Sequence, residues 1–235
     1  MKPIVKIIKY FVLKQKLSYF KMFDIVDKTQ YLSILQQNKH HFDHLLNIIQ
    51  QSNESLEGNC FYNHSTTTLA PDLINKQINI FSIAKHSHNI LEIGFNAGHS
   101  TLLFLLANTT SHVTCFDICE HKYTIPCFNY IDNHFPGRVT LYKGDANQQL
   151  SKLYLDKWNK SFDLFHIDGP HNSSLAHINF LWCRKFANKG NIIIWDDIDI
   201  PTLNLLWENY KDDQLVTPFH LLHTPQYPHA LGIFN

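Results

Sequence analysis

The sequence predicts an α/β fold in which a mostly parallel sheet carries helices on both faces. Three observations support this prediction. Short apolar segments alternate with helical patterns from about residue 64 onward, a turn with two glycines joins the first of these segments to a helix, and an acidic residue follows nearly every segment. Alternating strands and helices are typical of parallel sheets, because the crossover between two parallel strands usually contains a helix.

The first 63 residues read as a helical cap, separate from the α/β domain expected at residues 64–235. Helical patterns cover Ile4–Phe20 and Tyr31–Gln51, and a polar stretch at 52–59 ends them. The first pattern mixes apolar residues with lysines. It has no apolar run long enough to cross a bilayer and no signal-type cleavage site. We therefore expect it to dock on its own domain or on a second subunit, with a membrane surface as the alternative.

Within the α/β domain, each expected strand is a short run rich in β-branched, aromatic or other apolar residues, and each expected helix has an apolar stripe or a proline at its start. The expected strands are Asn89–Ile93, Val113–Phe116, Val139–Tyr142, Phe162–Ile167 and Asn191–Trp195, followed by an antiparallel closing pair at Phe219–Leu222 and Ala230–Phe234. The expected helices are Pro71–Lys85, Ser100–Leu106, Leu175–Ala187 and Leu203–Tyr210.

Composition restricts the class of protein. The chain has 235 residues, of which 44% are apolar and 17% charged, as expected for one folded α/β domain with a helical addition. Its 20 basic and 20 acidic residues balance, which disfavours a nucleic-acid partner, because such proteins usually carry a basic surplus. The five cysteines are odd in number and include no C-x-x-C pair, so we expect reduced thiols and a cytoplasmic location.

A turn after the first strand predicts a nucleotide-type cofactor site. Its sequence, Glu92-Ile93-Gly94-Phe95-Asn96-Ala97-Gly98, leads into a helix near Ser100. Gly94 and Gly98 permit a tight backbone and the close approach of a ligand, and the helix offers free N–H groups. The second glycine falls four residues after the first. This spacing differs from the dinucleotide pattern G-x-G-x-x-G and favours a smaller adenosyl cofactor, with a purely architectural turn as the alternative.

Acidic residues at the ends of the next two strands are candidates for the rest of that cofactor. Ligands of open parallel sheets bind at the carboxyl ends of the strands. Asp117 follows the second strand and could accept hydrogen bonds from both hydroxyls of a ribose. Asp145, followed by Ala146, comes after the third strand and could accept from the exocyclic amine of an adenine. The alternative for both acids is a helix cap or a loop position.

Asp168, Asp196 and Asp197 form the most informative cluster. They follow two strands expected to be neighbours, and three carboxylates at one edge repel each other unless a cation lies between them. Oxygen ligands suit Mg²⁺, Mn²⁺ or Ca²⁺ better than Zn²⁺, although one of the adjacent pair could cap the next helix. His171 follows Asp168 in the same loop and could accept a proton from a metal-bound hydroxyl. An exposed loop histidine is the alternative.

Over about residues 64–235 these motifs resemble the class I S-adenosylmethionine-dependent methyltransferases, most closely the metal-dependent O-methyltransferases that act on catechols or on antibiotic sugars. The segment at 91–100 is similar to the first motif of that family, Ile167-Asp168-Gly169-Pro170-His171 to its I-D-G-x-H, and Trp195-Asp196-Asp197 to its second metal motif. Catechol-type enzymes carry lysine where this chain has His171, so the histidine favours the sugar-methylating branch. Two departures are Pro170, where an acid is commoner, and the lack of a tyrosine at 172–174.

The resemblance implies a Rossmann-like methyltransferase sheet with S-adenosylmethionine and Mg²⁺ or Mn²⁺ as cofactors. The implied cofactor-binding residues are Glu92, Gly94, Phe95, Asn96, Gly98, Ser100, Asp117, Asp145 and Ala146. The implied metal ligands are Asp168, Asp196 and Asp197, and His171 is the implied general base.

We therefore expect a magnesium-dependent O-methyltransferase that acts on adjacent hydroxyls of a small molecule, in particular a sugar or glycoside. A catechol or phenolic acceptor is the nearest alternative. A nicotinamide-dependent oxidoreductase or a non-catalytic protein on a related fold are alternatives from other classes. The glycine spacing and the Asp196-Asp197 pair disfavour the oxidoreductase. We expect no transmembrane segment, a possible homo-oligomer through the N-terminal helices, and acceptor contacts from Tyr62, Asn63 and His64.

Overall fold

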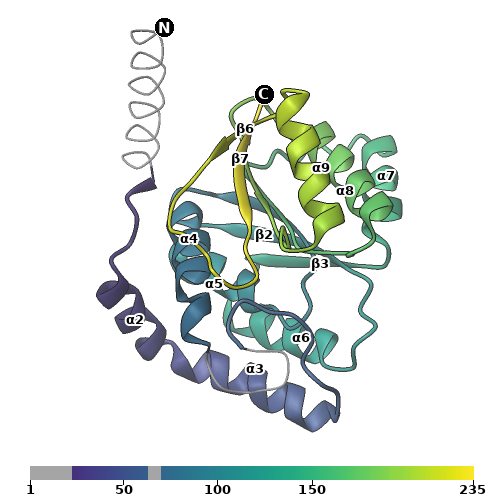
Figure 1. The fold of residues 1–235 in the computed structure, drawn as a ribbon. Helices are drawn as coiled ribbons and strands as arrows, with labels where there is room; N and C mark the ends of the chain where they lie inside the picture. The colour runs from purple at the N-terminus through teal and green to yellow at the C-terminus, as the bar shows by residue number, and fades with distance from the viewer. Residues whose placement is uncertain (1–22, 63–69) are drawn as a thin grey trace, which may run out of the picture.

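The computed structural model describes residues 23–62 and 70–235, and in that part of the chain seven strands form one sheet (Figure 1). The strands are β1 (Asn89–Ile93), β2 (His112–Asp117), β3 (Val139–Lys143), β4 (Leu164–Ile167), β5 (Ile192–Trp195), β6 (Val216–Phe219) and β7 (Ala230–Phe234). Their order across the sheet is β3-β2-β1-β4-β5-β7-β6. The first five are parallel, and β7 runs antiparallel between β5 and β6. The predicted fold class is confirmed.

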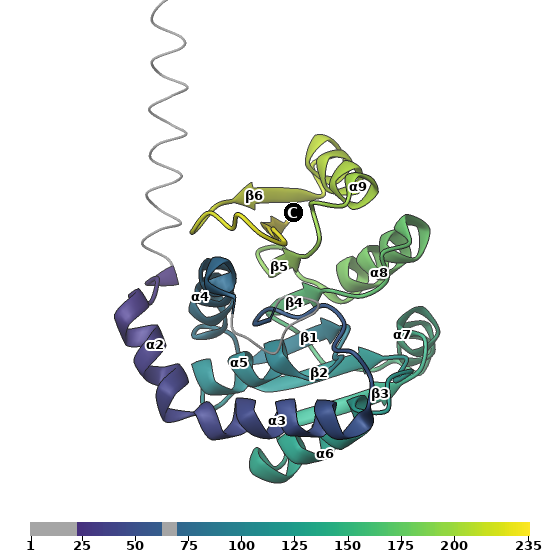
Figure 2. The ribbon, with the colours of Figure 1, turned by 60° about the horizontal axis from the view of Figure 1, so that its bottom comes forward.

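Helices cover both faces of the sheet (Figure 2). They are α2 (Lys28–Gln37), α3 (Lys39–Ser52), α4 (Ile74–Ala84), α5 (His99–Ala107), α6 (Thr124–His134), α7 (Ala146–Leu155), α8 (Ser173–Phe186) and α9 (Pro201–Asp212), with a 3₁₀ turn at Pro71–Leu73 before α4. One layer consists of α7, α8 and α9. The other contains α4, α5 and α6, and α2 and α3 lie outside it against α4 and α6.

Two apolar cores follow from this layering, because the side chains of a strand alternate between the two faces of the sheet. In β1, Ile90 belongs to the core beneath α4, α5 and α6, whereas Leu91 belongs to the core beneath α7, α8 and α9. Both side chains are fully buried. Strands covered on both faces are continuously apolar, which is why the central strands could be found from the sequence.

Helix α8 begins where the Asn172 side chain accepts hydrogen bonds from the backbone N–H groups of Ser174 and Leu175. Its buried residues recur at helical spacing: Ala176, Asn179, Phe180 and Cys183. Such a stripe normally consists of apolar residues that pack on the sheet. An asparagine therefore stands at a core position of this helix.

Several elements differ from the predictions. The single helix expected at Tyr31–Gln51 is two helices, because the chain turns at Asn38, whose side-chain amide donates to the carbonyl oxygen of Ile34 (2.9 Å). The closing strand expected at Phe219–Leu222 was placed too late, since β6 ends at Phe219. Helices α6 and α7 were not predicted. The helix expected at Ile4–Phe20 lies outside the described residues.

Strand β6 lies at one edge of the sheet and pairs on one side only, with β7. It contains Pro218, which is exposed and stands opposite Gly232. Proline has no backbone N–H and is found in sheets mainly at such edges. None of the helices in the described ranges is long and apolar enough to span a bilayer.

Candidate functional site

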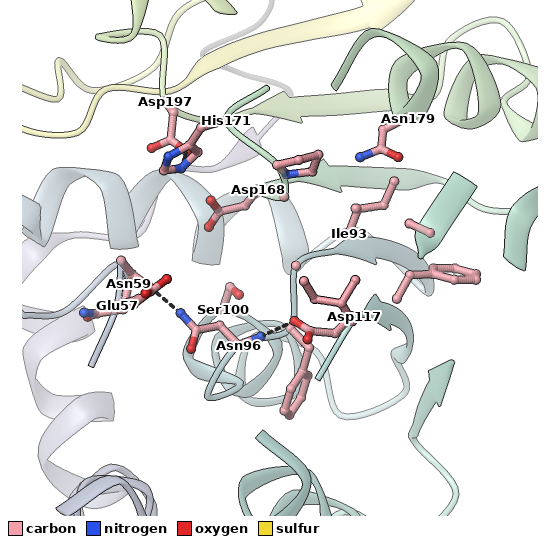
Figure 3. Close-up of a pocket in the computed structure, with 18 of the residues that line it drawn as sticks. Glu57, Asn59, Ile93, Asn96, Ser100, Asp117, Asp168, His171, Asn179 and Asp197 are labelled. Atoms are coloured by element: carbon pink, nitrogen blue, oxygen red, sulfur yellow. Dashed lines mark hydrogen bonds and ion pairs between the residues drawn. The ribbon is translucent and has the colours of Figure 1, made fainter. Parts of the chain in front are cut away.

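A cavity of about 560 Å³ opens at the carboxyl edge of the parallel strands (Figure 3). Its walls are the loops after β1 to β5 and the segment at 57–62 that leads out of α3. Among the residues predicted for the site, those that line it are Gly94, Phe95, Asn96, Ser100, Asp117, Asp145, Ala146, Asp168, His171 and Asp197. Loops far apart in sequence therefore meet where the order of the strands reverses, between β1 and β4, as expected for a ligand site in an open α/β sheet.

The glycine turn after β1 has backbone that only glycine tolerates. Gly94 has φ +95°, and a Cβ atom there would lie 1.8 Å from the carbonyl oxygen of Asp168. The Gly94 N–H donates to the carbonyl oxygen of Phe116 (2.9 Å), and the Asp168 N–H donates to that of Ile93 (2.9 Å). Backbone contacts thus hold the loops after β1, β2 and β4 together, and Gly94 leaves the space for this approach.

Two residues of the predicted cofactor set lie behind the cavity wall. Glu92 is fully buried, and its carboxylate accepts hydrogen bonds from Ser100 and Thr101 and lies 3.1 Å from Nδ1 of His166. It is hydrogen-bonded to Ser100, which lines the cavity, and the predicted contact of Glu92 with a cofactor stays a prediction. Gly98 has φ +79°, and a Cβ atom there would lie 2.6 Å from the side chains of Ile131 and Phe95. Its role is packing at the start of α5.

The acids after β2 and β3 both line the cavity and both order their own loops. Asp117 accepts hydrogen bonds from the N–H groups of Asn96 (2.8 Å) and Cys119 (2.6 Å). Each oxygen keeps a lone pair that could accept from a ribose hydroxyl. Asp145 caps α7 by accepting from the Asn147 N–H (2.7 Å). The capping alternative is thus realised for Asp145, while the predicted contacts with ribose and adenine stay predictions.

A lysine side chain lies within the acidic cluster, and the sequence analysis did not predict it. Lys76, from α4, places Nζ 2.6 Å from Oδ1 of Asp196, with 4% and 1% of the two side chains exposed. Burial opposes the charge on both groups. Attraction by Asp196 and Asp168 nevertheless raises the pKa of Lys76, and attraction by Lys76 lowers the pKa of Asp196. The two form a buried ion pair.

Lys76 and Asp196 continue into a buried chain of polar groups that crosses the sheet. His166, in β4, lies between Glu92 and Asp196, with Nδ1 3.1 Å from Oε1 of Glu92 and Nε2 3.8 Å from Oδ2 of Asp196. Burial alone would lower the pKa of His166, but the nearby carboxylates of Asp196 and Glu92 raise it to about 10. This shift favours the charged form of the imidazole. The negative charges of Glu92 and Asp196 therefore offset the positive charges of Lys76 and His166.

Asp168 and Asp197 do not belong to this set of four charged side chains. Burial and the repulsion of Asp196 raise the pKa of each above its ordinary value. Ligand atoms of His166, Asp168 and Asp196 lie within 4.8 Å of one another, and Asp197 does not belong to this group. Oδ2 of Asp197 lies 3.0 Å from Nε2 of His171, whose side chain is 66% exposed (Figure 3). The predicted approach of His171 to the acidic cluster is observed, through Asp197.

The donor set fits a hard divalent cation. Oδ2 of Asp196 is buried and has no hydrogen-bond partner within the described part of the chain. Asp197 has φ +58°, a backbone strain that is typical of functional sites, and its side chain lines the cavity. Carboxylate oxygens are the ligands that Mg²⁺ and Mn²⁺ prefer. Asp168 and Asp196 therefore offer oxygens that suit such a cation, with Lys76 already at Oδ1 of Asp196, whereas Asp197 lies outside the group of close ligand atoms.

The segment at 57–62 closes one side of the cavity. Asn96 donates through its side-chain amide to the carbonyl oxygen of Gly58 (2.7 Å), which ties this segment to the glycine turn (Figure 3). Of the predicted acceptor contacts, Tyr62 lines the cavity, and Asn63 and His64 lie outside the described residues. Sequence reasoning missed Asn179 in the opposite wall. A polar residue in an otherwise apolar helical stripe was the signal that could have found it.

Comparisons with known proteins agree with this geometry. Residues 91–198 match a family model described as a methyltransferase domain. Among curated proteins, none matches the sequence.

Several solved structures share the fold. An O-methyltransferase from Bacillus cereus in complex with SAH has a TM-score of 0.62 at 19% identity, over 83% of this chain and 91% of that chain. TomG from Streptomyces achromogenes, an O-methyltransferase of tomaymycin synthesis in complex with SAM, has a TM-score of 0.62 at 14% identity, over 83% of this chain and 89% of that chain. CalS11, a TDP-rhamnose 3′-O-methyltransferase of calicheamicin biosynthesis, has a TM-score of 0.57 at 14% identity, over 84% of this chain and 94% of that chain. At these identities the likeness is one of fold.

Proposed function

Because residues 91–198 form a methyltransferase domain with the class I fold, we propose that this protein transfers the methyl group of S-adenosylmethionine to a hydroxyl oxygen of a small molecule. One observation carries the proposal. The glycine turn after β1, the acid at the end of β2, and the group formed by Asp168, Asp197 and His171 line the same cavity. Cofactor and acceptor could therefore meet in one space.

The cofactor lies along the loops after β1, β2 and β3 in this proposal. The turn and the start of α5 hold its methionine end, Asp117 holds the ribose, and the loop at Asp145 and Ala146 borders the adenine. Two proteins with the same fold support this assignment, because their structures contain SAH or SAM. Glu92 and Gly98 support the turn from behind.

The proposed reaction forms one bond to carbon and breaks another. The acceptor oxygen attacks the methyl carbon, the carbon–sulfur bond breaks with its electron pair left on sulfur, and the hydroxyl proton passes to His171. The products are a methyl ether and S-adenosylhomocysteine. The chain's main contribution is to hold the two reactants close and aligned, which can supply much of the rate.

We include a divalent cation, Mg²⁺ or Mn²⁺, held by Asp168, Asp196 and Asp197. When bound, such a cation favours loss of the proton from a coordinated hydroxyl. Two observations support this part of the proposal: Oδ2 of Asp196 accepts no hydrogen bond within the described residues, and ligand atoms of Asp168 and Asp196 lie within 4.8 Å of each other. His171 is well placed as the proton acceptor, since it lies beside Asp197 at the exposed side of the cavity.

The acceptor in this proposal is a sugar or glycoside with adjacent hydroxyls. The histidine at position 171 supports it, and so does the fold shared with CalS11, a TDP-rhamnose 3′-O-methyltransferase. A catechol or phenol is the alternative. We further propose that residues 1–63 act as a cap that contributes acceptor contacts, that the N-terminal helices mediate a homo-oligomer, and that the protein works in the cytoplasm.

Calorimetry with S-adenosylhomocysteine, with and without Mg²⁺, tests the cofactor, and transfer of a labelled methyl group to a panel of sugars and catechols tests the acceptor. We expect wild-type protein to bind the cofactor product and to methylate a sugar. Asp117→Asn should weaken cofactor binding about tenfold or more, whereas His171→Ala should keep binding and lose transfer. Binding of a nicotinamide cofactor instead would favour an oxidoreductase. No binding of either cofactor would favour a non-catalytic protein.

A further inference from the structure

Asn179 is a buried amide without a partner. Its exposed fraction is 1%, and neither Nδ2 nor Oδ1 makes a hydrogen bond to any residue that the structure describes. Buried side-chain amides are nearly always hydrogen-bonded, because leaving donor and acceptor unpaired costs the free energy of their lost hydration. Its neighbours on the inner face of α8 are Ala176, Phe180 and Cys183, none of which satisfies it. The amide therefore needs a partner that the described part of the chain does not supply.

The cavity reaches this amide. Asn179 is part of the cavity wall, together with Ile93 and Gly169. Gly169 lacks a left-handed backbone, yet a Cβ atom there would lie 3.0 Å from Cγ2 of Ile93 and 3.5 Å from Nδ2 of Asn179. Glycine at this position therefore serves space rather than conformation. A larger residue at this position would crowd Ile93 and the Asn179 amide.

The position of Asn179 indicates which part of the cofactor it faces. Helix α8 packs against α7, the helix that follows the loop at 144–147, and both that loop and Asn179 line the cavity. In Figure 3 Asn179 lies on the same side of the pocket as Ile93, away from Glu57 and Asn59. On the proposed function, this is the adenine side. Asp145, the residue predicted to bind adenine, is already engaged as the cap of α7.

We propose that Asn179 recognises the adenine base of S-adenosylmethionine, with Oδ1 accepting from the 6-amino group and Nδ2 donating to the neighbouring ring nitrogen. This inference rests on the proposed function. An amide with both atoms free matches the donor and acceptor that adenine offers side by side, and asparagine pairs with adenine in this way in DNA recognition. The unpartnered amide in the cavity wall then has an explanation: the base supplies the hydrogen bonds that Asn179 lacks.

The test compares the binding of two ligands by calorimetry: S-adenosylhomocysteine and its purine counterpart, which lacks the 6-amino group. Wild-type protein should prefer the adenine compound about tenfold, since one neutral hydrogen bond is worth about that factor. Asn179→Leu, of nearly equal size, should bind both equally. Asn204→Leu is the control, because Asn204 is a half-buried asparagine of a helix, α9, and does not line the cavity. It should keep the wild-type preference.

Thermal unfolding without ligand separates recognition from a structural role. Asn179→Leu should unfold at the same or a higher temperature than wild type, because it removes an unpaired buried amide. Lower stability with an unchanged preference would overturn the inference, as would a wild-type protein that binds both compounds equally. The wild-type comparison decides the matter even if the variant does not fold. If wild-type protein binds neither compound, the proposed function fails, which is distinct from binding without preference.

Discussion

The buried ion pair between Lys76 and Asp196 should make Lys76 one of the least replaceable residues of α4. Replacing Lys76 with methionine keeps most of the side-chain volume and removes the charge. At 2.6 Å, the attraction between the two charges is roughly 6 kcal/mol for an effective dielectric constant of about 20. Desolvation costs several kcal/mol for each ion, so the intact pair contributes little net stability. Removing one partner is different, because the other charge stays buried without compensation, at a cost of about 3–5 kcal/mol.

For a chain of this length, that cost corresponds to a fall in melting temperature of about 10 °C. The measurement is urea unfolding of the Lys76→Met variant in a buffer with a chelator, so that no divalent cation replaces the lysine. The double variant Lys76→Met/Asp196→Asn is the matched control, since it removes both charges. It should recover at least half of the loss, because the two residues interact directly.

Two results would refute this reasoning. A loss of less than about 1 kcal/mol for Lys76→Met would mean that water or His166 compensates Asp196 without the lysine. A double variant whose loss equals the sum of the two single losses would mean that the pair is not coupled. Because Asp196 can be neutralised by protonation, the difference in stability between Lys76→Met and wild type should shrink as the pH falls toward 5. A loss that is independent of pH would contradict the ionic explanation.

Three further predictions concern the turn, the histidines and the metal. Gly94→Ala should lose about 4 kcal/mol or more, or fail to fold, because its Cβ would lie 1.8 Å from the Asp168 carbonyl oxygen; urea unfolding measures this. Burial lowers the pKa of His99 to about 4 and of His229 to about 3, below the unfolded value of about 6.5. Unfolded protein therefore binds more protons than folded protein below pH 6.5. The free energy of unfolding should fall between pH 6.5 and 5 by up to about 1.4 kcal/mol per pH unit for each histidine. A free energy of unfolding that does not change over this range would contradict the burial of these histidines. Asp168→Asn should weaken Mn²⁺ binding about tenfold or more in electron paramagnetic resonance titrations and change the affinity for S-adenosylhomocysteine less than threefold; equal Mn²⁺ affinity would remove Asp168 from the metal site.

Local sequence patterns predicted the parallel half of the sheet well. The strands around Ile90, Val113 and Ile193 are apolar because both faces of the sheet are covered there. The antiparallel half was harder. Val216–Phe219 includes an exposed proline, so its pattern is not that of a strand, and its pairing with β7 depends on distant residues. Helix α6 carries Pro126 in its first turn and mixed polarity after it, which hid it from a search for apolar stripes.

The residues of the candidate site also fall into two groups, those that the sequence predicts and those that it does not. Asp117, Asp168, Asp197 and His171 could be predicted to share a cavity, because residues at the carboxyl ends of neighbouring parallel strands lie close together whatever the details of packing. Asp196 was predicted with them, yet it faces the interior and pairs with Lys76.

Lys76, His166 and Asn179 lie inside a helix or a strand. Their importance comes from their surroundings in the fold: Asp196 pairs with Lys76, Glu92 lies beside His166, and Asn179 lines the cavity without a hydrogen-bond partner in the described residues. Contacts of that kind join residues that are far apart in the sequence. Neither the composition nor the spacing of motifs indicates them.

The proline at the outer strand also bears on how copies of the protein can associate. An edge strand with a full row of backbone donors and acceptors invites another chain to extend the sheet, which leads to aggregation or to dimers with one continuous sheet. Pro218 interrupts that row in β6, where only β7 is paired. Association through the β6 edge is therefore disfavoured, and subunit contacts should be sought on the helical faces of the molecule. Pro218 also disfavours pairing of β6 with another chain while the rest of the sheet is still folding.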